Sequence, residues 1–185
     1  MITGRNGSGK STLLHQLALL DEYDSGEITI HDQKTSPLSE RKRMELRLRE
    51  LGYIFQEYAL IGELSTLENV MLPAMMLGSN KEAKAKALEL LEKVDLKDKY
   101  RRLPSELSGG EQQRVAIARS LINNPKIIFA DEPTANLDTD SSKKVLETFK
   151  SLNEKESITV IMVTHEPDEL AYASRQIKLA DGRIV

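Results

Sequence analysis

Four short apolar runs, each leading into a polar or glycine residue, constrain the fold of this chain more than any other feature. Continuous runs of β-branched and aromatic residues are typical of strands buried on both faces, which form parallel sheets covered by helices. Open sheets of this kind bind ligands beyond the carboxyl ends of their strands. We therefore expect four segments to deliver polar groups to one sheet edge. The runs are residues 1–3, 53–55, 127–130 and 158–164, and they lead into Gly4, Gln56, Asp131 and His165.

Helical segments are expected between these runs. The stretch 81–94, for example, places Ala83, Ala87, Leu91 and Val94 at helical spacing. Residues 57–124 show little strand pattern. The sequence therefore predicts an α/β fold, with a mostly parallel sheet core formed by residues 1–56 and 125–185 and an inserted helical subdomain at 57–124. The helices are expected at residues 11–20, 37–49, 81–94, 111–121 and 141–152.

Composition excludes several classes of protein. A length of 185 residues suits one domain with an inserted lobe. A formal net charge of -3 gives no electrostatic reason to expect nucleic-acid binding. The absence of cysteine excludes disulfides and thiolate metal sites. No apolar run approaches the roughly 20 residues that a membrane-spanning helix needs, so any role at a membrane would require a partner.

The pattern G-x-x-x-x-G-K-[ST] is met in full by residues 4–11. Glycines let backbone N–H groups turn inward on phosphate oxygens, and the following helix adds its positive end. Lys10 would reach the β- and γ-phosphates, and the Ser11 hydroxyl would bind Mg²⁺. A flexible linker is the alternative, but a strand-like run precedes the loop and a helix follows it. We expect ATP and Mg²⁺ to bind here, through Gly4, Arg5, Asn6, Gly7, Ser8, Gly9, Lys10, Ser11 and Thr12.

Two carboxylates close the run 127–130. Asp131 could hold Mg²⁺, usually through water, and Glu132 could orient or deprotonate an attacking water. A loop pair that caps a nearby helix is the alternative. Beside a phosphate loop, the catalytic interpretation is favoured.

A helix start at residues 107–112 carries a second glycine-rich turn. Ser108 and Glu111 have the spacing of a capping box, so a helix cap is a sufficient explanation. The Gly109-Gly110 turn would also leave backbone N–H groups open to an anion. Both interpretations stay open on these residues alone.

Together, these motifs resemble the nucleotide-binding domain of ATP-binding-cassette (ABC) proteins, a family with a P-loop NTPase fold. The match runs over essentially the whole chain and keeps the family's order. Within the family, the chain looks most like the lipoprotein-releasing and macrolide-export ATPases, on residues 51–56, 67–70, 104–107 and 130–138. The matching motifs are the phosphate loop, Gln56, the signature 107–112, residues 127–132 and 136–138, and His165.

The resemblance implies a role for each matching residue in hydrolysis. Gln56 would contact Mg²⁺ and the attacking water and would sense the transport partner. Glu132 would be the general base, and His165 would contact the γ-phosphate. Ser11 and Asp131 would complete the Mg²⁺ ligands. The chain would then be an ATP hydrolase.

The resemblance also implies partners. Two chains would pair head to tail and sandwich two ATP molecules, with Asp138 at the interface. Ser108 and Gly110 would bind the γ-phosphate of ATP held by the other subunit. The pair would power a separate transmembrane permease from the cytoplasmic face of the membrane, in export or in extrusion of lipoproteins or peptides. Gating of a cell-division or signalling complex is the alternative.

Two further expectations follow from the resemblance. Family members carry strands before the phosphate loop, including an aromatic residue that stacks on adenine. The chain is therefore expected to be truncated at its N-terminus, with weakened or lost ATPase activity. A groove for a cytoplasmic helix of the permease is expected at Tyr58, Leu60, Ile61 and Leu64. The Met-rich run 70–77, interrupted by Pro73, is expected to pack mainly in the core, and part of it could also line that groove because it follows the Gln56 segment.

Overall fold

The computed structural model describes the backbone of residues 1–185 and the side chains of all of them except 80 and 81. Strands and helices alternate along most of the chain. In order, the elements are β1 (Ile2–Gly4), α1 (Lys10–Leu17), β2 (Thr29–Ile30), β3 (Gln33–Lys34), α2 (Glu40–Glu50), β4 (Leu51–Ile54), α3 (Thr66–Met76), α4 (Asn80–Lys93), η1 (Lys97–Lys99), η2 (Pro104–Glu106), α5 (Gly109–Leu121), β5 (Ile127–Asp131), α6 (Thr139–Glu156), β6 (Thr159–Thr164), η3 (Pro167–Tyr172), β7 (Ile177–Ala180) and β8 (Arg183–Ile184).

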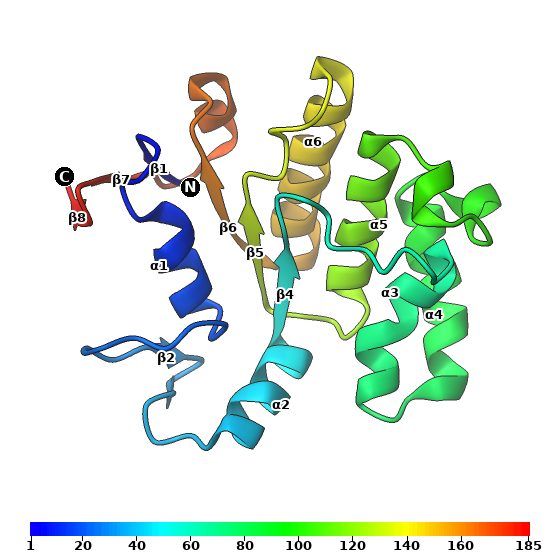
Figure 1. Cartoon of the computed structure of the whole chain (residues 1–185), viewed down its shortest axis with the longest axis horizontal. Helices are drawn as coiled ribbons and strands as arrows, with labels where there is room; N and C mark the ends of the chain where they lie inside the picture. Colours follow the sequence, from blue (N-terminus) through cyan, green and yellow to red (C-terminus); the bar gives the residue numbers. More distant parts are fainter.

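A six-stranded sheet in the order β4-β5-β6-β1-β7-β8 forms the centre of the molecule. The pairs from β4 to β7 are parallel, and only β8 runs antiparallel to its neighbour. Figure 1 shows that β4, β5 and β6 point the same way, so their carboxyl ends meet at one edge. The predicted parallel sheet is therefore confirmed, and all four apolar runs contribute strands to it.

Both faces of the sheet are buried, as the continuous apolar runs predicted. Phe129 and Val163 face α1, in a cluster that also contains Leu14. Their neighbours Ile128 and Met162 face the larger core on the other side. Consecutive residues of a strand point to opposite faces, so apolar residues at every position are needed to cover both.

Helices α3, α4 and α5 gather beside β4, on the right of Figure 1. One apolar core joins them to the sheet, since Val70 of α3, Leu91 of α4 and Ile117 of α5 belong to the same cluster as Ile128. This arrangement agrees with a helical lobe inserted between β4 and β5. We keep the division into residues 1–56 with 125–185, and 57–124, as a proposal.

Helix α3 differs from the expectation for the Met-rich run. It continues through Pro73, because a capping box between Ser65 and Glu68 starts it and its buried face anchors it. Only part of the run is core: Met75 and Met76 are 45% and 61% exposed. Other helix boundaries shift by at most four residues, and the largest shift is at the C-terminal end of α6, which continues to Glu156.

Candidate functional site

The phosphate loop connects β1 to α1 in a form that requires glycine. A Cβ at Gly4 would lie 2.3 Å from the carbonyl oxygen of Leu179 and 2.6 Å from Ser8 Oγ. Gly9 has a φ of 94°, in the left-handed region, and it directly precedes Lys10 at the start of the helix. The backbone therefore turns tightly enough to present successive N–H groups to a ligand.

Lys10 is the strongest indication that this loop binds an anion. Its side chain is 5% exposed, and its Nζ donates to the carbonyl oxygen of Arg5 at 3.2 Å. No carboxylate among the described residues pairs with it, and the buried Ser8 hydroxyl also has no protein partner. A buried cation without a counter-charge is costly, so phosphate oxygens fit this position. The predicted loop residues Asn6, Gly7 and Thr12 are exposed around the same turn.

Ser11 and Asp131 meet across the first turn of α1. Ser11 Oγ donates to Asp131 Oδ1 at 3.0 Å, and Asp131 is the last residue of β5. Among the described residues, no group of three His, Cys, Asp or Glu side chains forms a ready-made metal cage. Mg²⁺ usually takes only one or two protein ligands and completes its shell with phosphates and water, so this oxygen pair fits it.

Glu132 and His165 follow the two adjacent strands β5 and β6. His165 Nδ1 lies 3.3 Å from Glu132 Oε2, and His165 Nε2 lies 3.1 Å from Glu166 Oε1. Glu132 has a φ of 42°, which is uncommon for a residue with a side chain. Such backbone conformations cluster at functional sites, where surrounding structure holds them in place.

Gln56 lies at the same edge, two residues beyond the end of β4. The side chain is exposed, and its backbone carbonyl accepts from Asn136 Nδ2 at 3.5 Å. Since Ile54 pairs with Ala130, Gln56 and Asp131 leave neighbouring strands almost level with each other. The structure thus gathers the phosphate loop, Gln56, Asp131, Glu132 and His165 along one sheet edge.

The signature residues lie on a different side of the sheet. Ser108 caps α5 through the predicted capping box, accepting from the Glu111 N–H and donating its own N–H to the Glu111 carboxylate. Lys99, together with the Ser108 N–H, holds the pKa of Glu111 below its ordinary value. Helix α5 packs beside β4. Three strand spacings of about 4.8 Å separate β4 from β1, roughly 14 Å in all, so Ser108 does not reach its own phosphate loop.

Asp138 caps α6 and borders the signature. Its carboxylate accepts from the Ser141 N–H at 2.9 Å and from the Ser141 hydroxyl at 2.7 Å, which lowers its pKa. A Cβ on Gly110 would lie 2.7 Å from that same hydroxyl. The two predicted interface elements, Asp138 and the Ser108–Gly110 turn, are therefore adjacent.

Sequence reasoning missed three polar residues near this edge. His15 lies one helical turn after Ser11 and also approaches Asp131. Thr134 donates to the buried carboxyl group of Glu169. The spacing of Ser11 and His15 on one helix face was a usable signal. The Thr134–Glu169 contact depends on the fold, because Thr134 lies in the turn after β5 and Glu169 lies in η3, 35 residues later.

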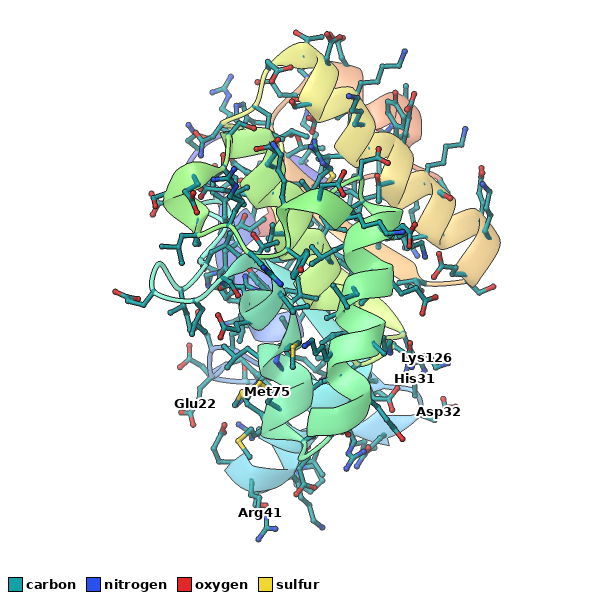
Figure 2. All side chains as sticks on the ribbon, turned by 90° about the vertical axis from the view of Figure 1, so that its right-hand side faces the viewer. Glu22, His31, Asp32, Arg41, Met75 and Lys126 are labelled. Carbon is teal, nitrogen blue, oxygen red and sulfur yellow. The ribbon has the colours of Figure 1, made fainter. Side chains whose placement is uncertain are left out.

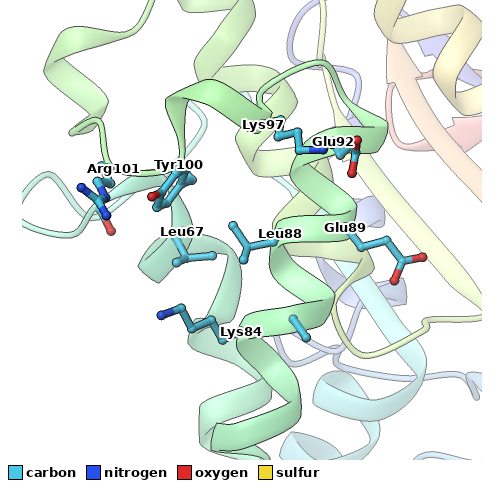
Figure 3. Close-up of a pocket in the computed structure, with 10 residues that line it drawn as sticks. Leu67, Lys84, Leu88, Glu89, Glu92, Lys97, Tyr100 and Arg101 are labelled. Carbon is cyan, nitrogen blue, oxygen red and sulfur yellow. Dashed lines mark hydrogen bonds and ion pairs between the residues drawn. The ribbon is translucent and has the colours of Figure 1, made fainter.

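A pocket of about 840 Å³ lies away from this edge, between α3, α4 and the segment that follows η1. Figure 3 shows Leu67, Leu88 and Tyr100 around it, with Lys84 and Arg101 on one side. Leu67 belongs to the stretch 67–70 that resembles the export ATPases, but none of the lining residues belongs to the predicted nucleotide-binding motifs. We assign it no part in nucleotide binding.

Comparisons with known proteins agree with this geometry. A family model described as ABC transporter matches residues 1–135. The chain belongs to the ABC transporter family of ATP-binding proteins. It is 54% identical to an uncharacterised ABC transporter ATP-binding protein of Methanocaldococcus jannaschii, covering all of this chain and 83% of that protein. The similarity to the lipoprotein-releasing and macrolide-export ATPases is also confirmed.

The lipoprotein-releasing system ATP-binding protein LolD of Leptospira interrogans is 45% identical, over all of this chain and 78% of its own length. The macrolide export ATP-binding/permease protein MacB of Syntrophobacter fumaroxidans is 44% identical, over 99% of this chain and 26% of its own length. A solved dimeric ATP-binding cassette, in a post-hydrolysis state with ADP and Pi, superposes with a TM-score of 0.90. It is 40% identical, over 99% of this chain and 81% of its own. The predicted fold, an ABC cassette of the P-loop NTPase class, is confirmed, and membership of this ABC family implies ATP hydrolysis.

Proposed function

We propose that two copies of this chain pair head to tail, hydrolyse ATP at their shared interface and drive a separate membrane permease that exports its substrate. The observation that supports the pairing is the position of Ser108. It is a helix N-terminus suited to an anion, yet it lies beyond β4 and cannot reach the loop that holds the phosphates in the same chain. A second copy brings the two halves together. A structural relative is a dimer bound to ADP and Pi.

Each half-site has its own task in the proposed reaction. Lys10 balances the phosphate charge, and Ser11 and Asp131 would hold Mg²⁺, which would stabilise the charge that develops on the phosphates. Glu132 accepts a proton from the attacking water. His165 fixes the Glu132 carboxylate from one side and contacts the γ-phosphate. Gln56 would be a further ligand of Mg²⁺.

The partner's Ser108 and Gly110 then bind the γ-phosphate that this chain holds, and Asp138 lies at the same interface. Closure of the dimer therefore requires ATP, and hydrolysis removes the group that both chains share. This coupling would convert ATP turnover into opening and closing of the pair.

A surface groove of about 410 Å³ suits a helix of the permease. It is lined by Leu20, Met44, Phe55, Pro73 and Met76, among others, and several of these are unusually exposed for apolar residues. Figure 2 shows Met75, which precedes Met76 in α3 and is 45% exposed, toward the end of the molecule that carries Arg41 of α2. Phe55 directly precedes Gln56, so a helix bound in the groove would contact the segment that positions Gln56.

The groove matches our expectation only in part: Pro73 and Met76 of the run 70–77 line it, whereas Tyr58, Leu60, Ile61 and Leu64 do not. Tyr58 and Leu60 pack against the main core instead of lining an open surface. Arg119 also donates a hydrogen bond of 2.7 Å to the Tyr58 carbonyl oxygen. Ile61 is 40% exposed but lies outside the groove. The helix-binding surface that we propose is therefore centred on Phe55 and Met76.

The base assignment is tested with Glu132→Gln and a matched control, Glu166→Gln. Both carboxylates contact His165, from opposite ring nitrogens. We expect Glu132→Gln to lose at least about 100-fold in hydrolysis and to accumulate as an ATP-bound dimer in light scattering. Glu166→Gln should turn over normally. Normal turnover by Glu132→Gln would contradict the base assignment.

The pairing is tested by mixing two inactive chains, Ser108→Arg and Lys10→Ala. Their heterodimer has one intact site, so the mixture should regain hydrolysis that neither chain shows alone. A mixture that stays inactive, while both chains fold and dimerise, would exclude head-to-tail pairing.

The helix groove is tested by co-purification of the membrane partner. Met76→Glu should release the permease, whereas Ile61→Glu should not. Recovery of a cell-division or signalling membrane protein, with no permease, would favour the gating role instead.

A further inference from the structure

His15 connects the end of α1 to the carboxylate that ends β5. It lies four residues after Ser11, so the two side chains occupy the same helix face. Ser11 Oγ donates to Asp131 Oδ1 at 3.0 Å, and His15 Nε2 lies 3.7 Å from Asp131 Oδ2. Ser11 and His15, on one helix face, therefore approach the two oxygens of a single carboxylate.

The other ring nitrogen of His15 is anchored as well. Nδ1 lies 3.2 Å from Asp21 Oδ2, in the turn that follows α1. That turn is fixed because the Leu20 N–H donates to the His15 carbonyl at 2.9 Å. An imidazole held by one carboxylate presents its second nitrogen in a defined direction.

The ring of Tyr53 packs beside this imidazole, with the centroids 5.7 Å apart at 58°. Burial, with the nearby Asp131 and Asp21 carboxylates, raises the pKa of Tyr53, so its phenol stays neutral. The ring also contacts Phe55, at 4.4 Å between centroids, two residues after it in the segment that leads into Gln56. The His15 imidazole thus packs against the Tyr53 ring on one side and has a carboxylate near each of its two nitrogens.

We propose that His15 is a positioning residue for the Mg²⁺ site, which fixes the plane of the Asp131 carboxylate. One hydrogen bond from Ser11 leaves that carboxylate free to rotate, and the imidazole, whose Nε2 lies 3.7 Å from the other oxygen and thus just beyond hydrogen-bond distance, restricts this rotation by its position. This inference rests on the proposed function. The alternative is that His15 only pairs with Asp21. Exposed ion pairs of this kind contribute little to stability.

Three substitutions separate these roles. The side chain in His15→Gln is long enough to place an N–H donor near the position of Nε2, close to Asp131. The side chain in His15→Asn is shorter and can place a polar group only near the position of Nδ1, close to Asp21. His15→Leu keeps neither. Gln16→Leu is the matched control, because Gln16 lies next along α1 and contacts the Glu22 carbonyl instead of Asp131.

The readout is Mn²⁺ bound in the presence of ADP, measured on the full chain by electron paramagnetic resonance, with thermal unfolding recorded alongside. Loss of an outer partner of a metal ligand typically lowers metal affinity about 10–100-fold. We expect a loss of about 10-fold for His15→Leu and His15→Asn, near wild-type affinity for His15→Gln and Gln16→Leu, and unchanged metal-free ADP binding in all four.

Wild-type Mn²⁺ affinity in His15→Leu would overturn the inference, as would an equal loss in His15→Gln. A parallel loss of metal-free ADP binding would also overturn it, since the effect would then be structural. The wild-type chain separates this inference from the proposed function. If the wild type binds no Mn²⁺ with ADP, the proposed function fails. If it binds Mn²⁺ and His15→Leu binds it equally well, only the role of His15 fails.

Discussion

Removing one hydroxyl group, in Thr134→Val, should destabilise the fold through a single buried hydrogen bond. Thr134 and Glu169 are both 6% exposed, and the hydroxyl donates to Glu169 Oε1. Glu169 Oε2 has no protein partner among the described residues. The Thr134 hydroxyl is therefore the one side-chain partner that this carboxyl group has in the described structure.

A buried acceptor that loses its partner costs about 1–3 kcal/mol, and more when it is charged. For a chain of this size, each kcal/mol lowers Tm by about 2–4 °C, so Thr134→Val should lower Tm by about 2–12 °C. Thr134→Ser keeps the hydroxyl and should lose much less. Circular dichroism melting and urea unfolding measure these differences.

The decisive comparison is the double variant Thr134→Val with Glu169→Leu. Replacing both partners by apolar groups removes the unsatisfied acceptor, and such replacements are often nearly neutral. The double variant should therefore be more stable than Thr134→Val alone. An unchanged Tm for Thr134→Val, or a double variant that is less stable than the single one, would refute the reasoning.

Two further predictions concern packing and pH. Gly52→Ala should destabilise the chain by about 1–3 kcal/mol, because the added Cβ would lie 2.7 Å from the Ser120 carbonyl oxygen; Gly62→Ala, where nothing lies within 4 Å, is the matched control in urea unfolding. The pKa of Asp138 is lowered by the hydroxyl and N–H of Ser141, so the stability that its charge contributes is present above about pH 4 and is lost as the pH falls through the folded-state pKa. Thermal unfolding of Asp138→Asn should therefore differ from wild type at neutral pH and converge with it in acid; a constant difference would contradict this assignment.

Most of the sheet could be predicted because each strand carries its own signal. The runs that became β5 and β6 are apolar at nearly every position, and burial on both faces requires that pattern. The phosphate-loop motif is also local, and Gly9 is set by the left-handed turn before α1, although Gly4 is required as well by the Leu179 carbonyl of the distant strand β7. The strand order was not predictable in this way, because it depends on which strands pair and not on any one of them.

The unexpected features all depend on contacts between distant segments. Pro73 costs a helix interior about 3 kcal/mol on its own, but the buried face of α3 and its capping box keep the helix continuous. The groove at Phe55 and Met76 exists because α3 lies beside the end of β4, which no local pattern encodes. Glu169 was overlooked for the same reason, since its partner Thr134 precedes it by 35 residues.

The sheet order also explains why motifs that are consecutive in sequence need not belong to one active site. Ser108 lies between Gln56 and Asp131 in the chain, which would suggest that all three converge. The chain after β4 instead leaves the sheet at its β4 edge and forms the helical lobe. It then returns as β5, which pairs with β4. Gln56 and Asp131 are thereby brought together, while Ser108 is placed three strands away from β1 and its phosphate loop. In the proposed dimer, the helix end at Ser108, which is adjacent to Asp138 and remote from its own Lys10, would instead face a phosphate held by the second chain.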